Sequence, residues 1–107
     1  METFCGEIIA VLPQIVYISF DIGGLDPRSC PNTGTPVPGG LEFHQAVDLV
    51  RGLAARSRTL IGFDLCEVAQ AEKDDWDATV AARILWHLCN WTGVSNGHLR
   101  HVLPQHC

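Results

Sequence analysis

The chain lacks a basic surface and lacks any apolar run of membrane-spanning length. Seven Lys and Arg stand against twelve Asp and Glu, a formal net charge of -5, and no stretch is rich in Lys or Arg. This balance argues against nucleic acid as a partner. No apolar run approaches the roughly 20 residues that cross a bilayer, and the N-terminus is acidic where a secretory signal would be basic. These features predict a cytoplasmic protein without a membrane partner.

The chain also lacks the paired cysteine spacing of a disulfide framework. Its five cysteines are an odd number and are widely separated, so we expect reduced thiols, none of them a nucleophile. Cys66 and Cys89 lie in apolar surroundings and are expected to behave as small hydrophobes.

What is present, with 47% hydrophobic and 18% charged residues in 107 positions, is typical of one globular domain. Apolar residues recur at helical spacing in three segments, and two runs are β-branched and apolar on both faces. A Gly/Pro-rich loop without helix or central strand is expected over 23–40. The predicted elements are helices over 3–12, 41–56 and 76–91 and strands over 15–20 and 59–66.

A right-handed crossover would make the two strands parallel and would bring Asp21 and Glu67 to the same carboxyl edge. Two strands that are apolar on both faces cannot be covered by three short helices. We therefore expect either further strands before Met1 in a longer parent protein, which we favour, or burial against another copy or subunit.

Three ordered motifs make a specific combination. They are Ser19–Pro27 (SFDIGGLDP), Asn32–Leu41 (NTGTPVPGGL) and Gly62–Val68 (GFDLCEV), followed by a helical segment over Thr79–Leu88. Together they resemble the C-terminal part of the ureohydrolase family of arginases, agmatinases, formiminoglutamases and guanidinobutyrases. The resemblance implies an α/β fold. Residues 1–95 would form the C-terminal strand-helix-strand-helix portion of a three-layer parallel-sheet arginase-like fold, and 96–107 would be a disordered tail.

The resemblance implies two bridged Mn²⁺ ions whose hydroxide attacks the guanidinium carbon of a small guanidine or amidine, releasing urea. By this likeness Asp21 is a bridging metal ligand, and Gly23 occupies the position of a missing Asp ligand. Glu67 would hold the substrate guanidinium, and Thr35 would orient that carboxylate. Family members are commonly trimers or hexamers, so a homo-oligomer is also implied.

The physical logic of such a site is general, because two hard cations lower the pKa of a bound water enough to attack a resonance-stabilised cation. The remaining ligands belong to GGxH and DAHxD segments, and neither segment occurs in these 107 residues. We therefore expect an incomplete, inactive hydrolase. The alternative is a non-catalytic binding or assembly module derived from that fold, and the particular guanidine or amidine stays open.

Other acidic and histidine positions favour plainer interpretations. Asp26 precedes a proline and suits turn initiation. Asp64 could be either a buried hydrogen-bonded residue or a group adjoining the metals. The pattern His98, His101, His106 and Cys107 could suggest zinc, but in a terminal tail without periodicity we interpret it as accidental.

Overall fold

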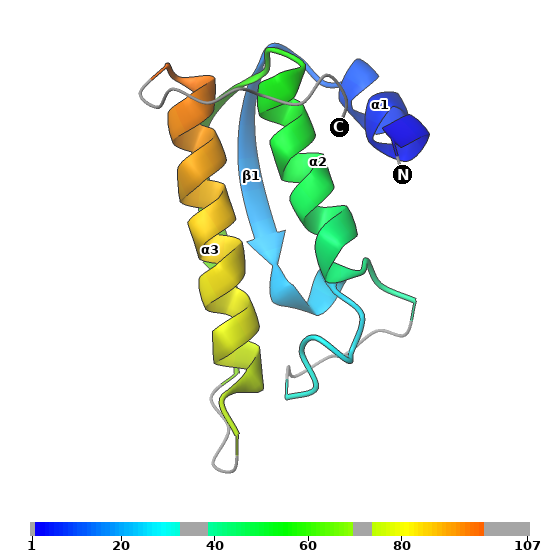
Figure 1. Ribbon diagram of the computed structural model, residues 1–107, viewed down its shortest axis with the longest axis vertical. Helices are drawn as coiled ribbons and strands as arrows, with labels where there is room; N and C mark the ends of the chain where they lie inside the picture. Colours follow the sequence, from blue (N-terminus) through cyan, green and yellow to red (C-terminus); the bar gives the residue numbers. More distant parts are fainter. Residues whose placement is uncertain (1, 33–38, 70–73, 98–107) are drawn as a thin grey trace.

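The computed structural model describes residues 2–32, 39–69 and 74–97. Figure 1 shows two long helices lying side by side, with a strand behind and between them. The elements are α1 (Glu2–Ala10), β1 (Ile15–Asp21), a 3₁₀ turn η1 (Ile22–Gly24), α2 (Phe43–Ala55), β2 (Thr59–Cys66) and α3 (Trp76–Ser95). The predicted order of elements is confirmed. The first helix ends at Ala10, earlier than expected, and the last continues to Ser95.

The two strands are parallel, as the crossover through α2 predicted. Their register runs from the pair Ile15 and Thr59 to the pair Asp21 and Cys66, with one irregularity after Val16. At the irregularity Tyr17 lies opposite Gly62, and a Cβ added to Gly62 would come within 3.1 Å of the tyrosine ring. Gly62 therefore leaves room for the ring to lie across β2.

The core lies between the strand pair and the helices α2 and α3. Alternate strand residues Val16, Ile18 and Phe20 pack against it, and Leu60 is fully buried. The helices contribute periodic apolar side chains to this layer, as expected for helices with one buried face. Those fully or nearly buried include Val50, Leu53, Ile84 and Leu88. One side of the strand pair is thus closed by packing.

The opposite side of the strand pair, called the outer face below, is not covered by any described element. Three of its apolar side chains stay open to solvent: Ile15 is 59% exposed, Tyr17 55% and Ile61 64%. The sequence predicted strands buried between two layers and too few helices to cover them. The structure shows that the outer face is the one left without a covering layer, because α2 and α3 both pack on the inner face.

The expectation for two cysteines was wrong. Cys66 and Cys89 are exposed, whereas Cys5 and Cys30 are buried. Cys66 ends β2 with an exposed side chain, and Cys89 lies on the solvent side of α3. An apolar neighbourhood in sequence did not reveal which side of a strand or helix the structure leaves open.

None of the described helices has the length and apolar character needed to cross a membrane.

Candidate functional site

The carboxyl ends of β1 and β2 bring the predicted site residues to one edge of the sheet. Asp21 is the last residue of β1 and pairs with Cys66, the last residue of β2. Glu67 follows directly after Cys66, so the two predicted carboxylates follow adjacent parallel strands. This is the edge at which open α/β sheets form their binding sites.

The turn after β1 fixes the Asp21 carboxylate. Asp21 keeps an extended backbone, and its Oδ1 accepts the N–H of Gly23 at 2.8 Å. Ile22 is fully buried beneath the turn, and the Leu25 N–H closes it on the Ile22 carbonyl at 3.0 Å. The sequence Asp-Ile-Gly therefore makes a small cap that anchors one carboxylate oxygen and leaves position 23 without a side chain.

Glu67 has an unusual backbone. Its φ is +66°, and Ser57 is the only other described residue besides glycine with positive φ. Such a conformation costs on the order of 1 kcal/mol or more for a residue with a Cβ, and it is enriched at functional sites. This left-handed backbone conformation comes directly after β2 ends.

Asp64 is a hydrogen-bond acceptor for three side chains on the outer face. Tyr17 Oη donates at 3.0 Å, Ser19 Oγ at 2.9 Å and Cys66 Sγ at 3.2 Å. The hydrogen bonds from Cys66, Ser19 and Tyr17 lower the pKa of the Asp64 carboxyl, and the bond to Asp64 raises the pKa of Tyr17. Of the two interpretations from the sequence, the hydrogen-bonded partner is the one seen, although the residue is only partly buried.

The two ends of the long loop are joined beside this site. The Leu41 N–H donates to the Gly24 carbonyl at 2.9 Å, and the Asp26 N–H donates to the Leu41 carbonyl at 2.8 Å. This short bridge between Leu25 and Leu41 leaves no room at Gly40, where an added Cβ would lie 2.7 Å from backbone atoms of Gly24 and Leu25. The loop thus leaves and returns at one point next to η1.

Asp26 initiates a turn, as expected from the proline that follows it. Its carbonyl accepts the Ser29 N–H at 2.8 Å, and its carboxylate accepts both the backbone N–H and the Nε of Arg28 at 3.0 Å. These bonds from Arg28 lower the pKa of Asp26. The Asp26 carboxylate therefore stabilises its own turn through Arg28.

A contact that the sequence did not reveal attaches the loop to α3. Asp77, on the first turn of α3, is 1% exposed, and both of its carboxylate oxygens accept the Asn32 N–H at 3.3 Å. The Asn32 side chain also donates to Asp77 Oδ1 at 3.0 Å. Thr35, predicted to orient Glu67, lies outside the described residues.

The donor set does not fit a binuclear metal centre. Within 2–32, 39–69 and 74–97, no three His, Cys, Asp or Glu side chains are grouped so that they could hold a metal ion. Of the predicted ligands, Asp21 has one oxygen on the Gly23 N–H, and Gly23 contributes no donor atom. A pair of divalent cations needs several protein ligands converging on each ion.

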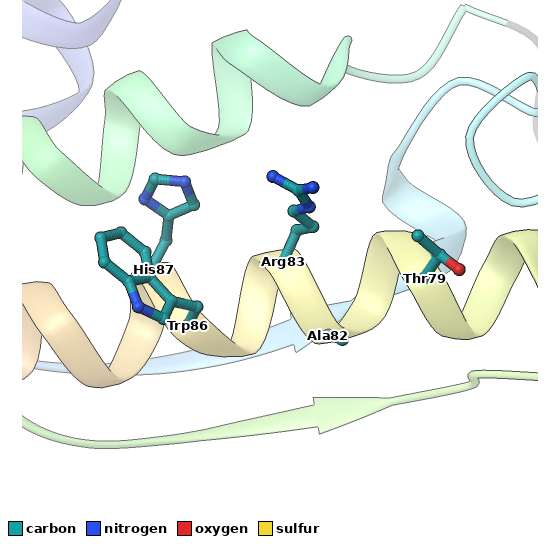
Figure 2. Close-up of a pocket in the computed structure, with 5 residues that line it drawn as sticks. All are labelled: Thr79, Ala82, Arg83, Trp86 and His87. Atoms are coloured by element: carbon teal, nitrogen blue, oxygen red, sulfur yellow. The ribbon is translucent and has the colours of Figure 1, made fainter.

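A surface depression lies away from the strand ends, on α3. It measures about 570 Å³ and is lined by Thr79, Ala82, Arg83, Trp86 and His87 of α3. Arg83 and His87 project from α3 toward α2 in Figure 2. Desolvation, followed by the charges of Arg51 and Arg83, lowers the pKa of His87. None of Asp21, Gly23 or Glu67 lines this depression, so it is separate from the strand ends.

Comparison with known proteins agrees with the fold and with the strand-end motifs. The Arginase family matches residues 1–90. The chain is 37% identical over 93 residues to the N(1)-aminopropylagmatine ureohydrolase of Thermus thermophilus, covering 87% of this chain and 31% of that protein. It is 41% identical over 97 residues to the agmatinase of Sodalis glossinidius, with coverage of 85% and 31%.

Solved structures show the same relationship. A hypothetical agmatinase from Burkholderia thailandensis superposes with a TM-score of 0.73 at 38% identity, covering 91% of this chain and 31% of that one. Proclavaminate amidino hydrolase from Streptomyces clavuligerus gives 0.75 at 30% identity, covering 86% and 31%.

The fold defines an α/β chain of the arginase type. The chain belongs to the arginase family, and it spans about 31% of the length of the relatives it matches.

Proposed function

We propose that these 107 residues supply part of the active site of a manganese-dependent hydrolase of small linear guanidines or amidines, and that they do not catalyse the reaction by themselves. The observation that carries the proposal is the placement of Asp21 and Glu67 at the carboxyl ends of adjacent parallel strands, with the Gly23 N–H bonded to the Asp21 carboxylate and a positive φ at Glu67. Asp21 would contribute one metal ligand, and Glu67 would bind the guanidinium through charge-assisted hydrogen bonds.

The substrate class follows from the relatives. The two relatives compared by sequence are named agmatinase and N(1)-aminopropylagmatine ureohydrolase, which supports a guanidine carried on an amine chain. Manganese would supply the activated water when the full ligand set is present. Four described cysteines are free thiols, and reduced thiols are the rule in the cytoplasm, where we place the protein.

The inactivity of the isolated chain can be measured directly. Purified protein incubated with Mn²⁺ and agmatine should release no urea and should retain no stoichiometric metal after gel filtration. Urea release accompanied by tightly retained Mn²⁺ would contradict this part of the proposal.

The contribution of Asp21 and Glu67 needs a complete site. A chimera in which this chain replaces the matched segment of the Sodalis agmatinase, with Gly23→Asp, should release urea from agmatine. Glu67→Gln in that chimera should lower kcat/KM at least ~100-fold, because the charged partner of the substrate guanidinium is lost. Glu7→Gln, a matched change on α1, should leave the rate unchanged. A chimera indifferent to Glu67→Gln would remove Glu67 from the proposed role.

A second candidate function is a non-catalytic assembly module. Gly23 favours it, because the position offers no ligand, and so does the outer face with its exposed apolar side chains.

A further inference from the structure

We propose that the depression on α3 beside Arg83, Trp86 and His87 binds a small organic anion, a carboxylate or phosphate carried on an aromatic body. Neither Asp21 nor Glu67 lines this depression, which lies away from the strand ends. Binding there would be a property separate from the proposed function, and it can be tested without urea release or manganese.

Helical spacing places the lining residues on one side of α3. Ile84 and Leu88 lie one turn apart and are buried in the core. Thr79, Arg83 and His87 repeat at the same spacing one position earlier, roughly 100° around the helix, and line the depression. In Figure 2 Arg83 and His87 point toward α2, and β2 lies on the other side of α3 in that view. The depression therefore belongs to the helix layer and not to the outer face of the strand pair.

Arg83 brings an unpaired positive charge to the depression. None of the ion pairs among the described residues includes Arg83. Arg51 of α2, whose charge also acts on His87, is already paired with Asp48. A guanidinium presents a planar fork of N–H donors that fits the oxygens of a carboxylate or phosphate. In a chain whose net charge is -5, this local positive charge favours an anionic ligand.

His87 supplies a second donor at a fixed position. Its Nδ1 accepts the indole N–H of Trp91 at 3.3 Å, so the neutral imidazole carries its proton on Nε2. Desolvation and the charges of Arg51 and Arg83 lower the pKa of His87, which favours that neutral form. The Phe43 ring holds the imidazole from α2 in a T-shaped contact, with centroids 6.3 Å apart. Among the described groups none accepts the Nε2–H, which therefore remains able to bind an oxyanion.

Trp86 forms an aromatic wall of the depression. Its ring stands at 90° to the His87 ring with centroids 4.9 Å apart, yet the residue stays 60% exposed. Ala82, one turn earlier, has only a methyl side chain and so leaves space beside the indole. An aromatic ligand ring placed there would stack on Trp86 and remove apolar surface of both rings from water.

The negative charge and the aromatic body of the ligand are both required. An exposed charge pair contributes little in water because solvent and salt screen it, so Arg83 alone would not retain an inorganic anion. The depression measures about 570 Å³, within the range of pockets that hold small organic molecules. A ligand that contacts Arg83, His87 and Trp86 at once combines charge with buried apolar surface.

The experiment is a ligand titration of the full 107-residue chain, followed by NMR of its backbone and side-chain N–H groups. Phenyl phosphate and benzoate are the two probes, and they distinguish a phosphate from a carboxylate. We expect the tighter of the two to bind with a Kd on the order of 1 mM, with the largest shifts at the side-chain N–H groups of Arg83 and Trp86. Inorganic phosphate should bind at least ~10-fold more weakly, and benzyl alcohol, which lacks the charge, should not saturate.

Variants then assign the contacts. Arg83→Gln should weaken the tighter probe at least ~10-fold, because the unpaired guanidinium is removed. The matched control is Arg56→Gln, which removes the same charge at the end of α2 outside the depression and should change the Kd less than ~2-fold. Trp86→Ala should weaken the probe about 5-fold and leave inorganic phosphate unchanged, whereas Leu85→Ala, at a neighbouring exposed position, should alter neither. Circular dichroism should be unchanged in all these variants, since none of the replaced side chains belongs to the buried core.

The outcomes separate a binding site from simple charge attraction. Absence of saturable binding by both aromatic probes overturns the site and leaves Arg83 and His87 with a structural role alone. Equal weakening by Arg83→Gln and Arg56→Gln overturns it as well, because net charge would then explain the binding. Inorganic phosphate that binds as tightly as phenyl phosphate rejects the aromatic contact with Trp86. None of these results bears on the proposed hydrolase function, since no measurement depends on Asp21 or Glu67.

Discussion

Asn32 and Asp77, 45 positions apart, are joined by backbone and side-chain hydrogen bonds that fasten the long loop to the first turn of α3. Asp77 is the one charged residue among those described that is buried, at 1% exposure. A buried carboxylate is tolerated only when hydrogen-bond donors satisfy it, and Asn32 supplies both its N–H and its amide. The contact therefore links the signature loop to the helix that covers β2.

Replacing Asp77 should destabilise the chain. Asp77→Ala removes the acceptor and leaves the partly buried Asn32 N–H without its partner, so we expect the free energy of unfolding to fall by about 2 kcal/mol. Urea denaturation followed by tryptophan fluorescence measures the change. Asp75→Ala is the control, because Asp75 precedes the same helix without a side-chain capping bond, and its effect should stay within about 0.5 kcal/mol. Equal effects of the two changes would contradict the assigned role of Asp77.

The bridge between Leu25 and Leu41 leads to a second prediction, which concerns Gly40 and Gly24. Gly40→Ala should destabilise the protein by about 2 kcal/mol or more, because the new Cβ would lie 2.7 Å from the backbone of Gly24 and Leu25 and neither strand of the bridge can retreat without losing its hydrogen bonds. Thermal unfolding measures it. Gly24→Ala should be nearly neutral, since no atom lies within 4 Å of its added Cβ. A neutral Gly40→Ala would mean that the bridge is not closed in solution.

The sequence revealed the order of elements and the strand ends, because these depend on local patterns. Both strands were visible as short apolar runs, and β2 begins and ends where the pattern predicted. The right-handed crossover expected between the strands placed Asp21 and Glu67 at one edge, and the parallel register agrees.

Pairwise contacts over long separations were not visible. Asp77 looks like any acidic residue in the first turn of a helix, and only the folded loop brings Asn32 onto it. In the same way, periodicity could not tell that Cys66 would end on the outer face, or that Tyr17 would reach Asp64 across the strand pair. Such contacts depend on the register between β1 and β2 and on which face of the strand pair the helices cover.

The Tyr17 and Asp64 pair can be followed by titration, because Tyr17 is the single tyrosine of the chain. The hydrogen bond to Asp64 raises the pKa of Tyr17 above its ordinary value of 10.0. A raised folded-state pKa means that this stabilisation is present below the unfolded pKa and is lost as pH rises through the folded pKa. Ultraviolet absorbance should therefore give a tyrosine pKa above 10.0 that falls in Asp64→Asn.

The pKa of Asp64, the partner of Tyr17, shifts in the opposite direction. Hydrogen bonds hold the pKa of Asp64 below its usual range, so its contribution is present above about pH 4 and is lost as pH falls through the lower folded-state pKa. Ser19→Ala removes one donor and should raise the pKa of Asp64, measured by NMR of the carboxyl carbon. An unchanged carboxyl pKa would show that the Ser19 bond does not persist in solution.

The last prediction concerns the residue that departs from the family motif. Gly23→Asp adds a carboxylate two positions after Asp21. Among the described glycines only Gly39 and Gly97 have a left-handed φ, so Gly23 does not. The backbone conformation at position 23 is therefore one that an aspartate can adopt, and the N–H that holds Asp21 Oδ1 remains. We expect Mn²⁺ binding to the isolated chain to tighten about tenfold, still well short of a complete site, because two carboxylates can share one hard cation.

Free Mn²⁺ measured by electron paramagnetic resonance gives the affinity. Gly24→Asp is the matched control, because it adds the same charge one position further along the turn and should tighten binding less than twofold. Asp21→Asn combined with Gly23→Asp should return the affinity to that of the parent chain, since both carboxylates are required. If Gly23→Asp and Gly24→Asp tighten Mn²⁺ binding equally, the gain comes from net charge alone, and position 23 has no special relation to Asp21.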